Sequence, residues 1–277
     1  MTVPQSLAHV DPFPGYPRGW FVVALSEEVA ADAPLALRYF GRDLVAFRDE
    51  GGAAVVQEAH PRLASDGARS RFRVLERNGF VFVHYDPSGR EPAYEIPIVP
   101  QVGHPEWTAW QHGKLRLRTH SREIVENVVD VAHFRPVHKN DPAEFVNEFV
   151  GHRAIQRSVG HGMGQHAGTD YRLEATYYGP SFQITEMHSV VETVLYNTHT
   201  MVDEQHVDLR FGLMMQPGSQ GERFSEEYVR EYVRVVMHGF RQDARIWEHK
   251  RWRDRPVLCD GDGPIMQLRA WYAQYFD

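Results

Sequence analysis

Cysteine is almost absent from this sequence of 277 residues, since Cys259 is the only one. A single thiol excludes an internal disulfide, a cysteine-based zinc site and an iron–sulfur cluster held by several thiolates. An excess of basic charge is also missing, because 37 acidic residues stand against 30 basic ones. The phosphate backbone of nucleic acids attracts the opposite sign of charge, so we predict no nucleic-acid partner.

Long apolar runs are missing as well. No stretch reaches the roughly 18 consecutive apolar residues of a membrane-spanning helix, and residues 1–10 lack the basic start and apolar core of a secretion signal. We therefore predict no membrane span and a soluble, cytoplasmic protein, for which one reduced cysteine is ordinary. What the chain does have is 42% hydrophobic residues, enough for a sizeable core.

Residues 1–100 are predicted to form a small β-rich domain. Its short strand-like runs are separated by turn signals such as Asp49-Glu-Gly-Gly52, in which glycine accepts positive φ without steric cost. Five prolines in residues 86–105 are typical of an extended segment, so we place the domain boundary near residue 100. The expected strands are 20–25, 35–40, 44–48, 53–57, 71–75 and 80–84.

Residues 101–277 are predicted to form the second, larger domain. A strand over 114–120 and a helix over 121–134 precede strand-like runs across 145–217. Apolar residues three and four apart predict a long amphipathic helix over 222–252, and a second helix is expected over 264–276. A curved antiparallel sheet with the long helix laid across it is the economical packing, so we predict an α+β fold.

Two histidines and a carboxylate lie close together near the middle of the chain. On an ideal helix Asn127, Asp130 and His133 would share one face. His138 would lie about 140° from His133 at 3.6 residues per turn, but Pro136 interrupts a regular helix and lets the chain bend His138 back. Two imidazoles at one point suit a mononuclear metal ion. The alternative is that both are ordinary surface or core histidines.

Asp243 stands on the apolar stripe of the long C-terminal helix, where a leucine would be expected. An ionised carboxylate at a core position is costly unless it is paired or binds a metal ion. One interpretation is a buried salt bridge to Arg234 or Arg245, or a partly solvated position. The other joins Asp243 to the two histidines as the two-His, one-carboxylate triad of non-haem Fe(II) oxygenases.

The spacing Glu126-Asn127-x-x-Asp130-x-x-His133-x4-His138 resembles the iron-binding motif of Rieske-type non-haem iron oxygenases. Further stretches are similar to the 3-ketosteroid 9α-hydroxylase branch of that family and to its sterol-desaturase relatives. The resemblance covers nearly the whole chain. These stretches are Glu76-Arg-Asn-Gly-Phe-Val-Phe-Val83, Glu95-Ile-Pro97, Asp254-Arg-Pro-Val-Leu-Cys-Asp-Gly-Asp-Gly-Pro264 and Leu268-Arg-Ala-Trp-Tyr272.

The resemblance implies a truncated Rieske-like β domain followed by a helix-grip (Bet v 1/START-like) catalytic domain, assembled as a head-to-tail trimer. It implies that His133, His138 and Asp243 bind a mononuclear Fe(II). Asp130 would be the acid that bridges a neighbour's cluster to the iron-binding histidine, and such a carboxylate also orients the imidazole. Asn127 would lie beside the metal, or else be a plain amide on the helix surface.

One part of the family pattern is missing. Members hold a [2Fe–2S] cluster with two Cys and two His, spaced as Cys-x-His and Cys-x-x-His. Residues 56–72 contain His60 but no cysteine, and Cys259 lies in the C-terminal tail. We therefore predict that the cluster hairpins are deleted and that this chain has no iron–sulfur ligands and no [2Fe–2S] cluster.

We predict an oxygenase subunit that uses O2 to hydroxylate, demethylate or desaturate a large apolar, steroid-like substrate. Its electrons would come from a Rieske cluster on a partner oxygenase subunit, in a mixed trimer or hexamer served by a reductase. Two alternatives stay open: a non-catalytic structural or regulatory subunit, and an apolar-ligand-binding protein without metal. Catalysis is favoured because a purely structural subunit has no chemical reason to keep a carboxylate in a helix core.

Overall fold

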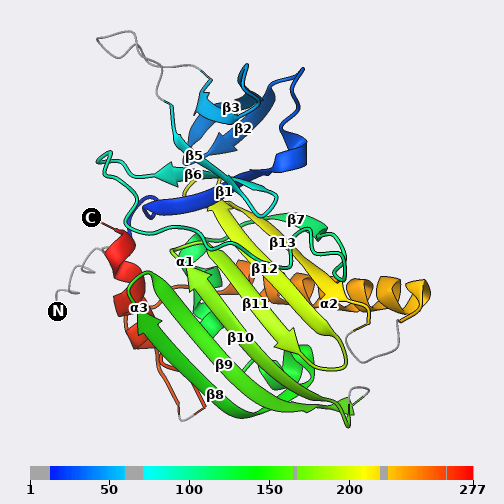
Figure 1. Ribbon diagram of the computed structural model, residues 1–277. Helices are drawn as coiled ribbons and strands as arrows, with labels where there is room; N and C mark the ends of the chain where they lie inside the picture. The colour runs from blue at the N-terminus through cyan, green and yellow to red at the C-terminus, as the bar shows by residue number, and fades with distance from the viewer. Residues whose placement is uncertain (1–12, 60–70, 165–166, 219–223, 260, 277) are drawn as a thin grey trace, which may run out of the picture.

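The computed structural model describes residues 13–59, 71–164, 167–218, 224–259 and 261–276. Strands dominate these residues and form three sheets, in which every pairing is antiparallel (Figure 1). The segment 60–67, which lies where the cluster ligands would be expected, is outside the described residues.

The N-terminal part forms two small sheets. One has the strand order β1-β6-β5 and the other β2-β3-β4. The six strands predicted before residue 100 are thus all present, with ends shifted by one or two residues. They are β1 (Gly19–Leu25), β2 (Leu35–Tyr39), β3 (Arg42–Arg48), β4 (Ala54–Glu58), β5 (Arg73–Arg77) and β6 (Phe80–Tyr85).

The larger part is built on one seven-stranded sheet with the order β7-β13-β12-β11-β10-β9-β8. Consecutive strands from β8 to β13 are neighbours, so this stretch is a meander, and β7 closes its other edge beside β13. The strands are β7 (Gln111–Leu117), β8 (Asn140–Val150), β9 (Arg153–Gly162), β10 (Asp170–Tyr178), β11 (Phe182–His188), β12 (Glu192–Met201) and β13 (Val207–Gln216).

Helices cover one face of this sheet, and in Figure 1 they lie behind it. The longest, α2 (Glu226–His249), begins where the Ser225 hydroxyl accepts a hydrogen bond from the Tyr228 amide, a standard N-cap. The chain thereby adopts the predicted α+β arrangement, with a long C-terminal helix laid across an antiparallel sheet. The other helical segments are η1 (Ser26–Glu28), α1 (Ser121–Val125), η2 (Glu126–Val129), η3 (Phe134–His138), α3 (Ile265–Tyr272) and η5 (Ala273–Tyr275).

The opposite face of the large sheet packs against the N-terminal part. All seven residues of β1 are buried. Phe80 stacks edge-on against Tyr196 of β12 at 4.7 Å between ring centroids, and Phe82 does so against Phe182 of β11 at 5.1 Å. These rings belong to one buried cluster that also reaches α3, so apolar packing fixes the large sheet on both faces.

None of the helices in the described ranges has the long apolar stretch that crossing a membrane requires.

A buried carboxylate adds a polar contact between the two parts. The Asp208 side chain on β13 is 3% exposed and accepts from Arg116 Nε at 2.8 Å, while Lys114 Nζ lies 3.0 Å away. The Tyr39 hydroxyl of β2 also donates to it at 3.1 Å. Burial alone would raise the pKa of Asp208, but Arg116 and Lys114 outweigh it and hold the pKa below the ordinary value.

We predict that Asp208→Asn lowers the free energy of unfolding at pH 7 by about 2 kcal/mol, because it removes the charge that two partly exposed cations share. The folded pKa lies below the ordinary 3.8, so this stabilisation is complete above that value and is lost as the pH falls through the folded pKa. Urea unfolding at pH 7 and near pH 3 measures the free energy of unfolding of both proteins. The difference between wild type and Asp208→Asn should be smaller near pH 3 than at pH 7.

Asp43→Asn is the matched control. Asp43 pairs with Arg38 at 2.6 Å, but both side chains are more than half exposed, so the change should stay below about 0.5 kcal/mol. Two results would contradict the assigned role of Asp208. One is an equal loss of unfolding free energy in the two variants, and the other is a loss for Asp208→Asn that is as large near pH 3 as at pH 7.

Candidate metal centre

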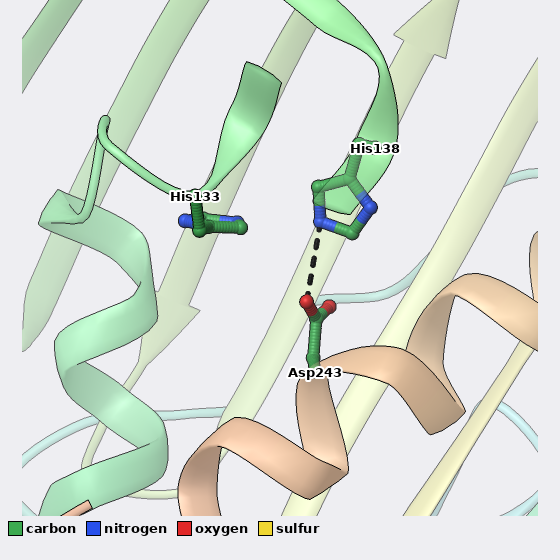
Figure 2. A group of neighbouring side chains, drawn as sticks. All are labelled: His133, His138 and Asp243. Carbon is green, nitrogen blue, oxygen red and sulfur yellow. Dashed lines mark ion pairs between the residues drawn. The ribbon is translucent and has the colours of Figure 1, made fainter. Parts of the chain in front are cut away.

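Two histidines from one short segment meet a carboxylate from α2 (Figure 2). One donor atom each from His133, His138 and Asp243 lies within 4.8 Å of the other two. The imidazole rings are 5.0 Å apart and nearly perpendicular, and His138 Nε2 is 3.3 Å from Asp243 Oδ1. The chain therefore brings to one point three residues that are up to 110 positions apart in the sequence.

The segment before His133 is less helical than the sequence predicts. A helix over 121–134 is wrong beyond Val129, because α1 and η2 end there and Asp130 is extended, with φ −83° and ψ 98°. Asn127, Asp130 and His133 therefore do not share one face of a regular helix, and that prediction is wrong. The extended residue instead turns the chain so that His133 starts a new helical turn.

That new turn, η3, is a single π-helical turn. The Lys139 amide donates to the Phe134 carbonyl, five residues earlier, and Lys139 adopts a left-handed conformation with φ 56°. Pro136 lies inside this turn. The sequence predicts that a break at Pro136 returns His138, whereas in the structure a wider turn, closed by Lys139, does so. Such π turns are frequent at functional sites.

Asp243 is 6% exposed, as its place on the apolar stripe of α2 predicts. Arg234, one of the two arginines considered as its partner, pairs instead with Glu231 at 2.5 Å. Among the described residues, Asp243 forms its ion pair with His138. The carboxylate is thus buried against an imidazole and not against a guanidinium.

Two buried atoms of this group lack hydrogen-bond partners within the described residues: His133 Nδ1 and Asp243 Oδ1. A buried polar atom without a partner costs roughly 1–3 kcal/mol, and more when it is charged. A cation bound between the three side chains would satisfy Asp243 Oδ1. Two imidazoles and one carboxylate are also the donor set of non-haem Fe(II) sites, so these residues fit a mononuclear iron.

Two further side chains from the motif surround His133. Asp130 Oδ2 lies 3.5 Å from His133 Nδ1, and the Asn127 amide nitrogen lies 3.5 Å from His133 Nε2. Burial opposes a charge on either partner of the Asp130–His133 pair. Their mutual attraction outweighs it, helped by Lys250 for Asp130 and by Asp243 for His133. The pKa of His133 is therefore raised and the pKa of Asp130 is lowered.

Sequence comparison assigns the chain to a family. Residues 83–276 match the 3-ketosteroid 9alpha-hydroxylase C-terminal domain. A probable 3-ketosteroid-9-alpha-monooxygenase oxygenase component from Rhodococcus rhodochrous is 33% identical over 94% of this chain and 80% of its own length. A Mycobacterium tuberculosis oxygenase component of the same name is 30% identical over 94% and 82%. A cholesterol 7-desaturase from Caenorhabditis elegans is 21% identical over 95% and 77%.

Solved structures of the same fold include dicamba monooxygenase bound to dicamba, with a TM-score of 0.72 and 14% identity over 93% of this chain and 96% of that one. NdmA from Pseudomonas putida has a TM-score of 0.68 and 17% identity over 92% and 88%. The chain belongs to the 3-ketosteroid 9α-hydroxylase C-terminal domain family, and it is an oxygenase subunit. The predicted Rieske-oxygenase resemblance, fold and enzyme class are confirmed.

Proposed function

We propose that this chain is an iron-carrying oxygenase subunit that receives its electrons from another polypeptide. The observation that carries the proposal is the group of His133, His138 and Asp243, whose donor atoms lie within 4.8 Å of one another and include a buried Asp243 oxygen without a hydrogen-bond partner in the described residues. These three residues would bind Fe(II), and bound iron would supply the activation of O2. A structural subunit would gain nothing from an unsatisfied carboxylate in the core.

The electron source is proposed from what the sequence lacks. Its one cysteine cannot replace the two that a Rieske cluster requires. A Rhodococcus rhodochrous relative that covers all of this chain aligns over 341 positions, 64 more than the 277 residues here. Residues 59–72 are all that separates β4 from β5. We place the loss of the cluster hairpins there, within a degenerate domain of residues 1–100 that precedes the catalytic domain of residues 101–277.

The partner would be a full-length oxygenase subunit with an intact cluster, in a mixed trimer or hexamer supplied by a reductase. Asp130 supports this arrangement because its side chain is 40% exposed while it contacts the buried His133. A surface carboxylate at that position can face a partner's cluster on one side and hold the His133 Nδ1 proton on the other. We place this assembly in the cytoplasm.

The substrate is proposed to be mostly apolar but to carry a few polar groups. Phe211 of β13 packs against Phe240 of α2 at 4.8 Å, so this face of the sheet looks towards the helix. Asn197, the cross-strand neighbour of Phe211, lies on the same face. It is 5% exposed, and its Oδ1 has no partner among the described residues.

A second buried amide lies on the same face, further along the sheet. Gln156 of β9 is 3% exposed, and its Nε2 lacks a partner in the described part of the chain. Its cross-strand neighbour Asn147 donates to the Val128 carbonyl at 2.9 Å, which places this face against the helical segment that precedes His133. A steroid-like molecule would satisfy both amides with a keto oxygen that accepts from Gln156 Nε2 and a hydroxyl that donates to Asn197 Oδ1, and a keto group agrees with the names of the relatives.

We predict that the anaerobically purified chain binds one equivalent of Fe(II), or of Co(II) as a spectroscopic probe. His133→Ala and Asp243→Ala should each weaken binding by at least about a hundredfold, because each removes one of three protein ligands. Metal analysis measures the number of metal ions bound per chain, and equilibrium dialysis measures the affinity.

His161→Ala is the control for metal binding. His161 pairs with Asp170 at 2.6 Å, and both side chains are largely exposed, so its removal should leave the affinity unchanged. A wild-type chain that holds no iron, with a His133→Ala variant that behaves identically, would rule out the catalytic role. It would leave the structural subunit and the carrier of apolar ligands as the two remaining functions.

Turnover should require the partner. With a companion subunit that carries Cys-x-His and Cys-x-x-His, a reductase and a 3-ketosteroid, we expect Asp130→Asn to lower kcat at least about tenfold while metal binding is kept. Asp141→Asn is the matched control, since Asp141 pairs with Arg135 at the partly exposed start of β8. Full turnover by the Asp130→Asn or the Asp243→Ala chain would show that catalysis takes place at the companion subunit's iron and that this subunit is structural.

A further inference from the structure

A buried ion cluster lies directly beside the candidate metal centre. Glu126, one residue before Asn127, is 4% exposed. Its Oε1 accepts from Arg269 Nε of α3 at 2.6 Å, and its Oε2 accepts from Lys250 Nζ. One carboxylate therefore joins the segment before the histidines to two elements from the C-terminal end of the chain.

Lys250 connects this cluster to α2. It is the residue directly after the helix, and its backbone amide completes the last turn by donating to the Ile246 carbonyl at 2.9 Å. Its ammonium group also donates to the Glu123 carbonyl at 3.2 Å. Asp243 lies on that helix, seven residues or about two turns before Lys250. The ion pair thus ties the helix that carries Asp243 to the segment that leads to His133.

Arg269 supports the same carboxylate from the other side. Its guanidinium lies over the Trp252 ring at 3.6 Å from the centroid and donates to the Arg253 carbonyl at 2.5 Å. These contacts fix Arg269 within α3 and the loop before it. Glu126 therefore keeps one well-placed partner even when its bond to Lys250 is removed.

The pair matters because no side chain in the first half of α2, up to Val236, is fully buried, so the helix is held mainly towards its C-terminal end. Most of its apolar stripe before Asp243 is only half-buried: Val229, Tyr232, Val233, Val236 and Phe240. Its buried side chains lie from the middle of the helix to its end: Met237, Asp243, Ala244 and Trp247. A partly desolvated pair with charge-assisted hydrogen bonds adds a directional contact that apolar side chains do not provide. It restricts both sliding and rotation of the helix end.

We propose that Glu126 and Lys250 form a positioning pair that holds Asp243 at the right distance from the two histidines. The proposal rests on the metal-binding function proposed above and adds to it a determinant outside the ligands. Breaking the pair should leave a folded chain in which the three donor groups are less well arranged, since groups that support metal ligands commonly contribute to affinity without touching the metal.

Lys250→Met tests the proposal, because it keeps most of the side-chain stem and leaves the Glu126–Arg269 pair in place. We expect the Co(II) dissociation constant to rise about tenfold and the cobalt d–d bands to shift. Lys250→Arg keeps the charge and should restore the dissociation constant to within about threefold of wild type. Circular dichroism of the metal-free variants should match wild type, since metal affinity is compared between folded chains.

Arg234→Met is the matched control, as it removes the exposed Glu231–Arg234 pair from the same helix and should change neither affinity nor spectrum. Glu126→Gln provides a second variant, which weakens both ion pairs and should reduce cobalt affinity at least as much as Lys250→Met. Wild-type affinity and spectrum in both Lys250→Met and Glu126→Gln would overturn the positioning role. A wild-type chain that binds no cobalt would instead overturn the metal site itself, and this inference with it.

Discussion

The burial of one carboxylate is the constraint on which the candidate site depends. Asp243 lies on the core side of α2, where an unpaired charge would be strongly destabilising. The structure places it against His138 and leaves one of its oxygens unsatisfied. Among the described residues no arginine pairs with it, so we infer that a bound cation is the reason why a charged residue occupies this position.

The surrounding fold serves to bring three sequence-distant segments to that carboxylate. One face of the large sheet lies against the helices, and the opposite face packs against β1 and β6, which fixes the position of the sheet. The π turn closed by Lys139 gathers the two histidines. The buried ion cluster around Glu126 then connects the histidine segment to the end of α2. Apolar packing thus sets the architecture, while a few charged contacts set the geometry of the site.

Much of this could be predicted from the sequence, because strands and amphipathic helices carry a periodic pattern of apolar residues. Asp243 was visible as an exception to such a pattern. The path from Val129 to Lys139 could not be predicted, since an extended residue and a π turn leave no periodic signal. The Glu126–Lys250 pair and the amides Gln156 and Asn197 were also missed, because polar residues inside alternating or helical runs indicate burial only when the neighbouring elements are known.

We propose that this chain has kept a mononuclear iron site and has lost the iron–sulfur cluster that would supply the site with electrons. Iron K-edge X-ray absorption on the anaerobically Fe(II)-loaded chain tests this claim most directly. The account predicts one iron per chain, coordinated by nitrogen and oxygen atoms at about 2.0–2.2 Å, the distances at which imidazole and carboxylate bind comparable divalent metals. A sulfur shell, a short iron–iron distance or a chain without bound iron would contradict it.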